Sequence, residues 1–122
     1  MIPTTWTPYR RDDDDELLGY LEHTTADACQ ARTLFGHPLG DSGSESDAER
    51  VLDALGLSYL AERWLLTLAD RDEPISVQIV ESSPQSLTVM SVDYGYEGDY
   101  GTPFILAVPV DPAELRPERR LG

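Results

Sequence analysis

Alternation of apolar and polar side chains over residues 75–81 is the feature that most constrains the fold. Ile75, Val77 and Ile79 would share one face of an extended strand, with polar residues between them on the other face. Turn-forming residues at 70–74 and 82–86 bound this segment, and residues 87–94 and 104–108 form two further apolar, β-branched runs. Strands that follow one another in this way predict an antiparallel meander.

The apolar residues of the segment before this meander fit both the helical and the strand periodicity. Its apolar residues over 57–68 match helical spacing, whereas Trp64, Leu66 and Leu68 alternate as they would in a strand. We predict a strand over 63–69, entered through a helical turn at 57–61, because the strand at 75–81 needs a neighbour. Upstream, Ser46 and Glu49 form a capping-box pattern that predicts a helix over 47–55.

The rest of the chain completes the expected architecture. Strands are predicted at 17–21 and 28–35, followed by a Gly-rich loop at 36–45. We expect an α+β, mainly β fold: a small antiparallel meander or an SH3-like partly closed barrel with one short helix. The main alternative is an open sheet with the 47–55 helix packed across one face. The predicted division is an extended, solvated acidic N-terminal arm at 1–16, a single globular domain at 17–110 and a C-terminal tail at 111–122 that begins with one helical turn.

Acidic residues dominate the charge of the chain, with 23 Asp and Glu against 9 basic residues and a formal net charge of −14. Every basic residue is Arg, a bias that we interpret as the coding preference of a GC-rich genome. So acidic a surface repels nucleic-acid phosphates and anionic lipids, and we expect no direct nucleic-acid binding and no membrane binding. A basic protein partner fits this charge, and a homo-oligomer is also compatible with it.

The location of the protein is predicted from three features. The first nine residues lack the basic start and apolar run of a signal peptide. No apolar stretch approaches the ~20 residues of a membrane helix. Cys29 is the only cysteine, so the chain has no internal disulfide. We therefore expect a cytoplasmic protein.

Residues 93–101 combine three tyrosines and three glycines with acidic side chains. Rigid amphipathic rings of this kind supply contact area at low entropic cost in binding loops. We interpret the loop as an acidic, aromatic surface for a basic protein partner. The predicted partner-binding residues are Tyr94, Tyr96, Glu97, Asp99 and Tyr100.

Catalytic and metal-binding patterns are weak in this chain. His23, Cys29 and His37 match no ligand spacing, and the acidic run at 12–16 lacks the glycine and the final ligand of an EF-hand loop. Residues 40–43 resemble the sequence around the serine nucleophile of trypsin-like proteases, but the chain is too short for that fold, and we interpret them as a polar loop. The sequence thus assigns no catalytic residue, metal site or cofactor.

These observations favour a non-enzymatic interaction protein that binds a basic protein partner through an acidic, tyrosine-rich surface. One alternative is a small-ligand-binding barrel with Trp64, Tyr59 and Tyr20 near its pocket. Another is an enzyme that depends on carboxylates, although no pair of them is singled out. A last alternative is a self-associating structural subunit that uses an exposed strand edge.

Overall fold

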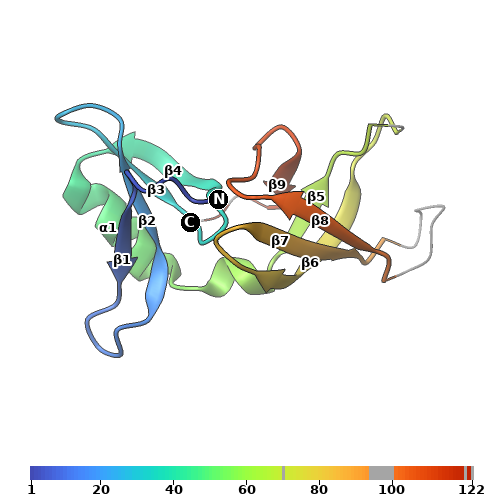
Figure 1. The fold of residues 1–122 in the computed structure, drawn as a ribbon, viewed down its shortest axis with the longest axis horizontal. Coiled ribbons are helices and arrows are strands. Elements are labelled where there is room, and N and C mark those ends of the chain that lie inside the picture. Colours follow the sequence, from blue (N-terminus) through green and yellow to red (C-terminus); the bar gives the residue numbers. More distant parts are fainter. Residues whose placement is uncertain (70, 94–100, 120, 122) are drawn as a thin grey trace.

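The computed structural model describes residues 1–69, 71–93, 101–119 and 121. Two antiparallel β-sheets and one α-helix account for most of the regular structure in these residues (Figure 1). This arrangement confirms the expected α+β, mainly β class.

The N-terminal part of the chain forms the first sheet, in which four consecutive strands are neighbours in the order β1-β2-β3-β4. These strands are β1 (Thr7–Arg10), β2 (Leu17–His23), β3 (Cys29–Arg32) and β4 (Pro38–Gly43). Helix α1 (Glu45–Leu55) packs across β2, β3 and β4 and buries Ala48 and Leu52 against them. One face of the sheet is thereby covered (Figure 1).

The rest of the chain forms the second sheet, in the order β8-β7-β6-β5-β9. The 3-10 helix η1 (Ser58–Ala61) leads into it, and its strands are β5 (Arg63–Leu66), β6 (Ile75–Ser82), β7 (Ser86–Ser91), β8 (Pro103–Ala107) and β9 (Leu115–Pro117). Strands β5 to β8 are a meander, and β9 returns to pair with β5. The predicted helical turn at 57–61 and strand from residue 63 are both present, although the strand ends at Leu66.

The two chain ends differ from the expectation of a solvated arm and a tail. Within the arm, Thr7 and Tyr9 pair with Leu21 and Gly19 of β2, so the acidic run at 12–16 lies in the turn between two strands. In the tail, Leu115 pairs with Leu66 and is fully buried. Apolar side chains at both ends therefore complete the core. Short-range sequence patterns do not reveal this burial, because it depends on contacts between distant parts of the chain.

Two local predictions in the N-terminal half also need correction. The expected loop at 36–45 contains β4, whose Leu39 is buried beside Ala31 of β3. The helix begins two residues earlier than predicted. Its N-cap is Ser44, whose hydroxyl accepts from the Asp47 N–H at 3.1 Å, while the Asp47 carboxylate accepts from the Ser44 N–H at 3.3 Å.

Aromatic rings join the two sheets into one core. Phe35, which follows β3, contacts the ring of Tyr59 at 5.7 Å and the ring of Trp64 at 5.2 Å, edge to face in both cases. The Tyr59 hydroxyl donates to the Leu18 carbonyl of β2 at 2.8 Å and accepts from the Leu34 N–H at 3.0 Å. The strands thus form two sheets around a shared core, with the predicted meander in the second sheet and helix α1 across one face of the first.

Gly36 lies where the backbones of the two halves approach closely. Its φ of +85° is in the left-handed region, and a Cβ at this position would be 2.4 Å from the Cβ of Pro109. The Val110 N–H donates to the Phe35 carbonyl next to this contact. The backbones approach closely here because residue 36 has no side chain.

Candidate functional site

The loop that the sequence singled out lies outside the described residues. Tyr94, Tyr96, Glu97, Asp99 and Tyr100 all belong to the undescribed stretch 94–100. On one side of it, the Asp93 carboxylate accepts from the Ser76 N–H at 3.2 Å. On the other side, the Gly101 N–H donates to the Ser91 carbonyl at 2.8 Å. The partner-binding role of the five residues stays a prediction.

A different tyrosine lies among carboxylates in the first sheet. The Tyr9 hydroxyl on β1 donates to the Asp53 carboxylate on α1 at 2.9 Å. Desolvation, that hydrogen bond and the charges of Asp53, Glu49 and Asp12 raise the pKa of Tyr9 to about 12. We call Tyr9, Asp12, Glu49 and Asp53 the acidic face.

The turn between β1 and β2 extends the acidic face. The Arg11 guanidinium donates to both carboxylate oxygens of Asp14, at 3.1 and 3.0 Å, and its N–H donates to the Glu16 carbonyl. The hydrogen bonds and charge of Arg11 hold the pKa of Asp14 below its usual range. Internal hydrogen bonds therefore fix the backbone of the turn, while Asp12, Asp13, Asp15 and Glu16 remain exposed.

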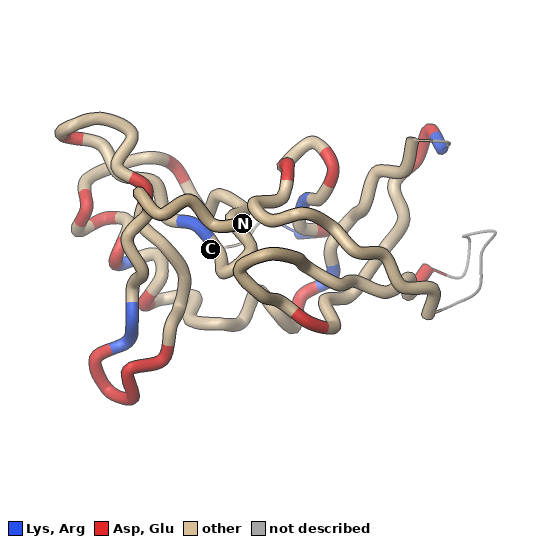
Figure 2. Tube along the Cα trace, viewed as in Figure 1, with Lys and Arg blue, Asp and Glu red and all other residues tan. Residues whose placement is uncertain are grey.

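Both halves of the molecule are acidic, and residues 58–122 carry a net charge of −6 (5 − 11). Residues 1–57 contain 12 acidic residues and 4 arginines, a net charge of −8 (4 − 12). In Figure 2, Asp and Glu gather on the β1–β2 turn and around α1. The sequence revealed the acidic run but not the acidic face. Tyr9 and Asp53 lie 44 positions apart in the sequence, and they meet only because β1 pairs with β2 and α1 packs on the same sheet.

The histidines and the cysteine are distributed over separate environments. His23 is exposed and contacts the Glu45 carboxylate at 3.1 Å. His37 is buried against Trp64, and Cys29 is buried on β3, where desolvation raises the pKa of its thiol. Among the residues that the structure describes, no group of three His, Cys, Asp or Glu side chains could hold a metal ion.

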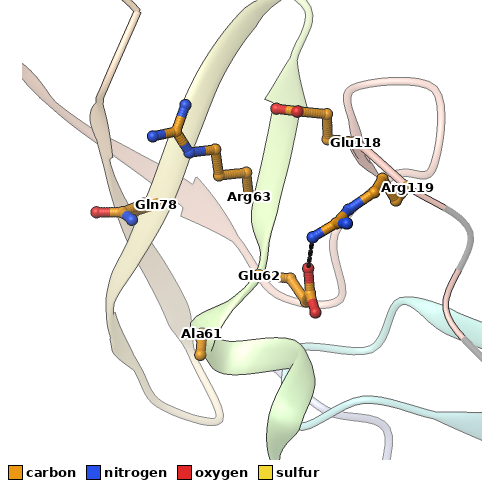
Figure 3. A pocket seen from close by; sticks show the side chains of 6 residues that line it. All are labelled: Ala61, Glu62, Arg63, Gln78, Glu118 and Arg119. Carbon is orange, nitrogen blue, oxygen red and sulfur yellow. Dashed lines mark ion pairs between the residues drawn. The ribbon is translucent and has the colours of Figure 1, made fainter.

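A polar hollow of about 430 Å³ lies beside η1, β5 and the end of β9 (Figure 3). Glu62 and Arg119 form an ion pair across it at 3.7 Å, and Arg63 points toward Gln78, its cross-strand neighbour. Glu118 accepts from the Ser76 hydroxyl at 3.4 Å. The two arginines balance the two glutamates, so this hollow lacks the negative charge of the acidic face.

The aromatic residues expected near a ligand pocket have other roles. Trp64 and Tyr59 are fully buried, and the Trp64 indole N–H donates to the Tyr59 carbonyl at 3.0 Å. Tyr20 lines a small hollow of about 140 Å³ between the sheets. The rings on which the ligand-binding alternative depended are therefore mainly core residues.

Comparison with known proteins identifies no relative of this chain: no family model, curated protein or solved structure matches it. Within the described parts of the chain, no helix has the length and apolar character needed to cross a membrane.

Proposed function

We propose that this protein is a non-enzymatic binding module of the cytoplasm that engages a basic protein partner through its acidic face. The observation that carries the proposal is the hydrogen bond from the partly exposed Tyr9 hydroxyl to the Asp53 carboxylate, at a position where the charges of Glu49 and Asp12 also act on the tyrosine. No nucleic acid or membrane takes part directly in this proposal.

The chemistry of the acidic face suits arginine and lysine side chains. Carboxylates attract a cationic partner over long range and then form charge-assisted hydrogen bonds with it. An aromatic ring beside them offers a face on which a guanidinium can stack. Arg32 over the ring of Trp6, at 4.8 Å from its centroid, is an example of such stacking in this molecule.

The structured β1–β2 turn favours the same function. Binding costs less entropy when the interacting groups are already held in place. Hydrogen bonds from Arg10 to the Asp15 carbonyl and from Arg11 to Asp14 fix the turn that carries the acidic run. The exposed carboxylates of this turn therefore extend the acidic face at little additional ordering cost.

The test compares two variants with the same net charge. One removes the acidic face through Asp12→Asn, Glu49→Gln and Asp53→Asn. The matched control removes three exposed carboxylates from the second half through Glu73→Gln, Glu81→Gln and Glu114→Gln. Affinity for a labelled oligoarginine peptide is measured by fluorescence anisotropy at increasing salt concentration.

We expect the first variant to bind the peptide about tenfold more weakly, because exposed charges contribute up to about 1 kcal/mol each. The control should bind nearly as the wild type does, and added salt should weaken all binding. An equal loss of affinity in both variants would show that peptide binding depends only on the net charge of the protein, which would contradict the proposal. Affinity purification from cell lysate at low and high salt then identifies the natural partner.

The predicted loop is tested separately by replacing Tyr94, Tyr96 and Tyr100 with Ala in the same peptide assay. Weaker binding would add this loop to the proposed surface. Unchanged binding would leave the acidic face as the site.

A further inference from the structure

The four outer strands of the two sheets differ in how they are protected against pairing with another chain. Exposed edges in soluble proteins usually carry charges, proline, bulges or very short strands. β1 contains Pro8 and a bulge at Tyr9–Arg10, and β4 contains Asp41, two glycines and a bulge in its pairing with β3. β9 has three residues and ends at Pro117.

Strand β8 lacks most of these protections. Its five residues, Pro-Phe-Ile-Leu-Ala, contain no charge and pair with β7 in unbroken register. Pro103 is its first residue, where a proline least disturbs pairing. The side chain of Ile105, at the centre of the strand, is 76% exposed.

The register shows which backbone groups of β8 face outward. The Ser91 N–H donates to the Thr102 carbonyl, and the Val108 N–H donates to the Gln85 carbonyl. Hydrogen-bonded pairs alternate along an antiparallel ladder, so Phe104 and Leu106 bond to β7. The N–H and C=O groups of Ile105 and Ala107 therefore point away from β7, toward the outer edge.

Charge indicates which partner suits this edge. Residues 82–92 and 101–110 contain no Asp, Glu, Arg or Lys, in a chain whose net charge is −14. Figure 2 shows β7 and β8 free of charged positions, while acidic residues lie elsewhere on the molecule. A basic partner would find no carboxylate on either strand, whereas a second copy of this chain brings no charge of its own onto these two strands.

We propose that two copies of this chain pair antiparallel along β8, about a twofold axis at Ile105. Ile105 exchanges both backbone hydrogen bonds with Ile105 of the second copy, and the Ala107 N–H donates to the second copy's Pro103 carbonyl. Pro103 lacks an N–H, so it acts there only as an acceptor. The same patch of each copy forms the contact, as twofold symmetry requires.

An apolar groove beside β8 supports this contact. Phe104 and Leu106 line it together with Leu66, Leu68 and Ala113, and its volume is about 500 Å³. Pairing along β8 brings the second copy's Leu106 beside Phe104 at this groove, removing apolar surface from water. Asp111 and Glu114 stand at the rim, so their repulsion, like that of the whole acidic chain, opposes the pairing.

The test is sedimentation velocity of the full chain over a range of protein and salt concentrations. Ile105→Glu places two like charges at the twofold axis. Val80→Glu is the matched control, because Val80 is also exposed, at 58%, but lies on the interior strand β6. Circular dichroism verifies that both variants are folded.

We expect a concentration-dependent dimer in the wild type that salt strengthens, because salt screens the repulsion between acidic copies. Ile105→Glu should weaken the dimer at least about tenfold, and Val80→Glu should leave it close to wild type. A wild type that stays monomeric at high salt, or equal effects of the two variants, would overturn the proposal. The salt response is opposite to that of the basic partner, so the two proposals succeed or fail independently.

Discussion

His37 lies between the two sheets, where its imidazole has little access to water. The residue is 7% exposed and packs edge to face on Trp64, with ring centroids 5.0 Å apart. Its Nδ1–H donates to the Pro38 carbonyl at 2.8 Å, which assigns the tautomer because a carbonyl can only accept. Burial, and to a lesser extent the charge of Arg32, lower the pKa of His37.

This shift makes folding stability depend on pH. The unfolded chain binds a proton at His37 near the ordinary pKa of about 6.5, whereas the folded chain binds it only at lower pH. Stability should therefore be fully present above about pH 6.5 and fall as the pH drops below it, by up to about 1.4 kcal/mol per pH unit. Urea unfolding of the wild type and His37→Gln from about pH 8 to about pH 5 measures this difference.

The carboxylates titrate over part of the same range, so the comparison between variants is what isolates His37. If His37→Gln and the wild type lost stability in parallel as the pH fell, the buried imidazole would not be the cause.

At the level of single elements, the start of α1 distinguishes two serines that the sequence makes nearly equivalent. Ser44 provides the cap, whereas Ser46 lies within the first turn of the helix. Ser44→Ala should lower the free energy of unfolding by about 1 kcal/mol, because the Asp47 N–H loses its acceptor. Ser46→Ala should change it little or raise it slightly, since alanine favours the helical conformation. Thermal and urea unfolding of both variants measure the effect, and a greater loss in Ser46→Ala would place the cap where the sequence suggested.

The same helix shows why local patterns predict elements better than their boundaries. Ser46 with Glu49 satisfies the capping-box pattern, but Ser44 with Asp47 satisfies it equally well in space. Which of the two serines caps the helix depends on where β4 ends, at Gly43. β4 itself was missed because its glycines and polar residues resemble a loop, and it is a strand because β3 offers it a neighbour.

At the level of the whole molecule, the division into two sheets depends on contacts between distant residues. The meander of β5 to β8 was predictable because its strands follow one another in the sequence and each pairs with the next. The contact of Phe35 with Trp64 and the pairing of β9 with β5 join segments far apart in the sequence. The acidic face was missed for the same reason, since Tyr9 and Asp53 give no shared local signal.

The shared core leads to a prediction about cooperativity. Neither sheet closes its core alone, because Phe35 from the first half packs on Tyr59 and Trp64, and the Tyr59 hydroxyl bonds to Leu18. We therefore expect both sheets to unfold in one transition. Cys29 on β3 reports on the first sheet, because its buried thiol reacts with a thiol reagent only after unfolding. Trp64 fluorescence reports on the second sheet, in a Trp6→Phe background that removes the other tryptophan.

The two probes should give the same urea midpoint in a single protein sample. Gly36→Ala should lower both midpoints together, because its Cβ would clash with Pro109 where the halves meet and its φ is unfavourable for alanine. A loss of more than about 2 kcal/mol is expected from such an overpacked, strained position. Gly101→Ala is the control, since it also has a positive φ but no atom near the position of an added Cβ. If thiol labelling and Trp64 fluorescence changed at different urea concentrations, the sheets would be separate folding units, and Gly36→Ala would then shift the two midpoints unequally.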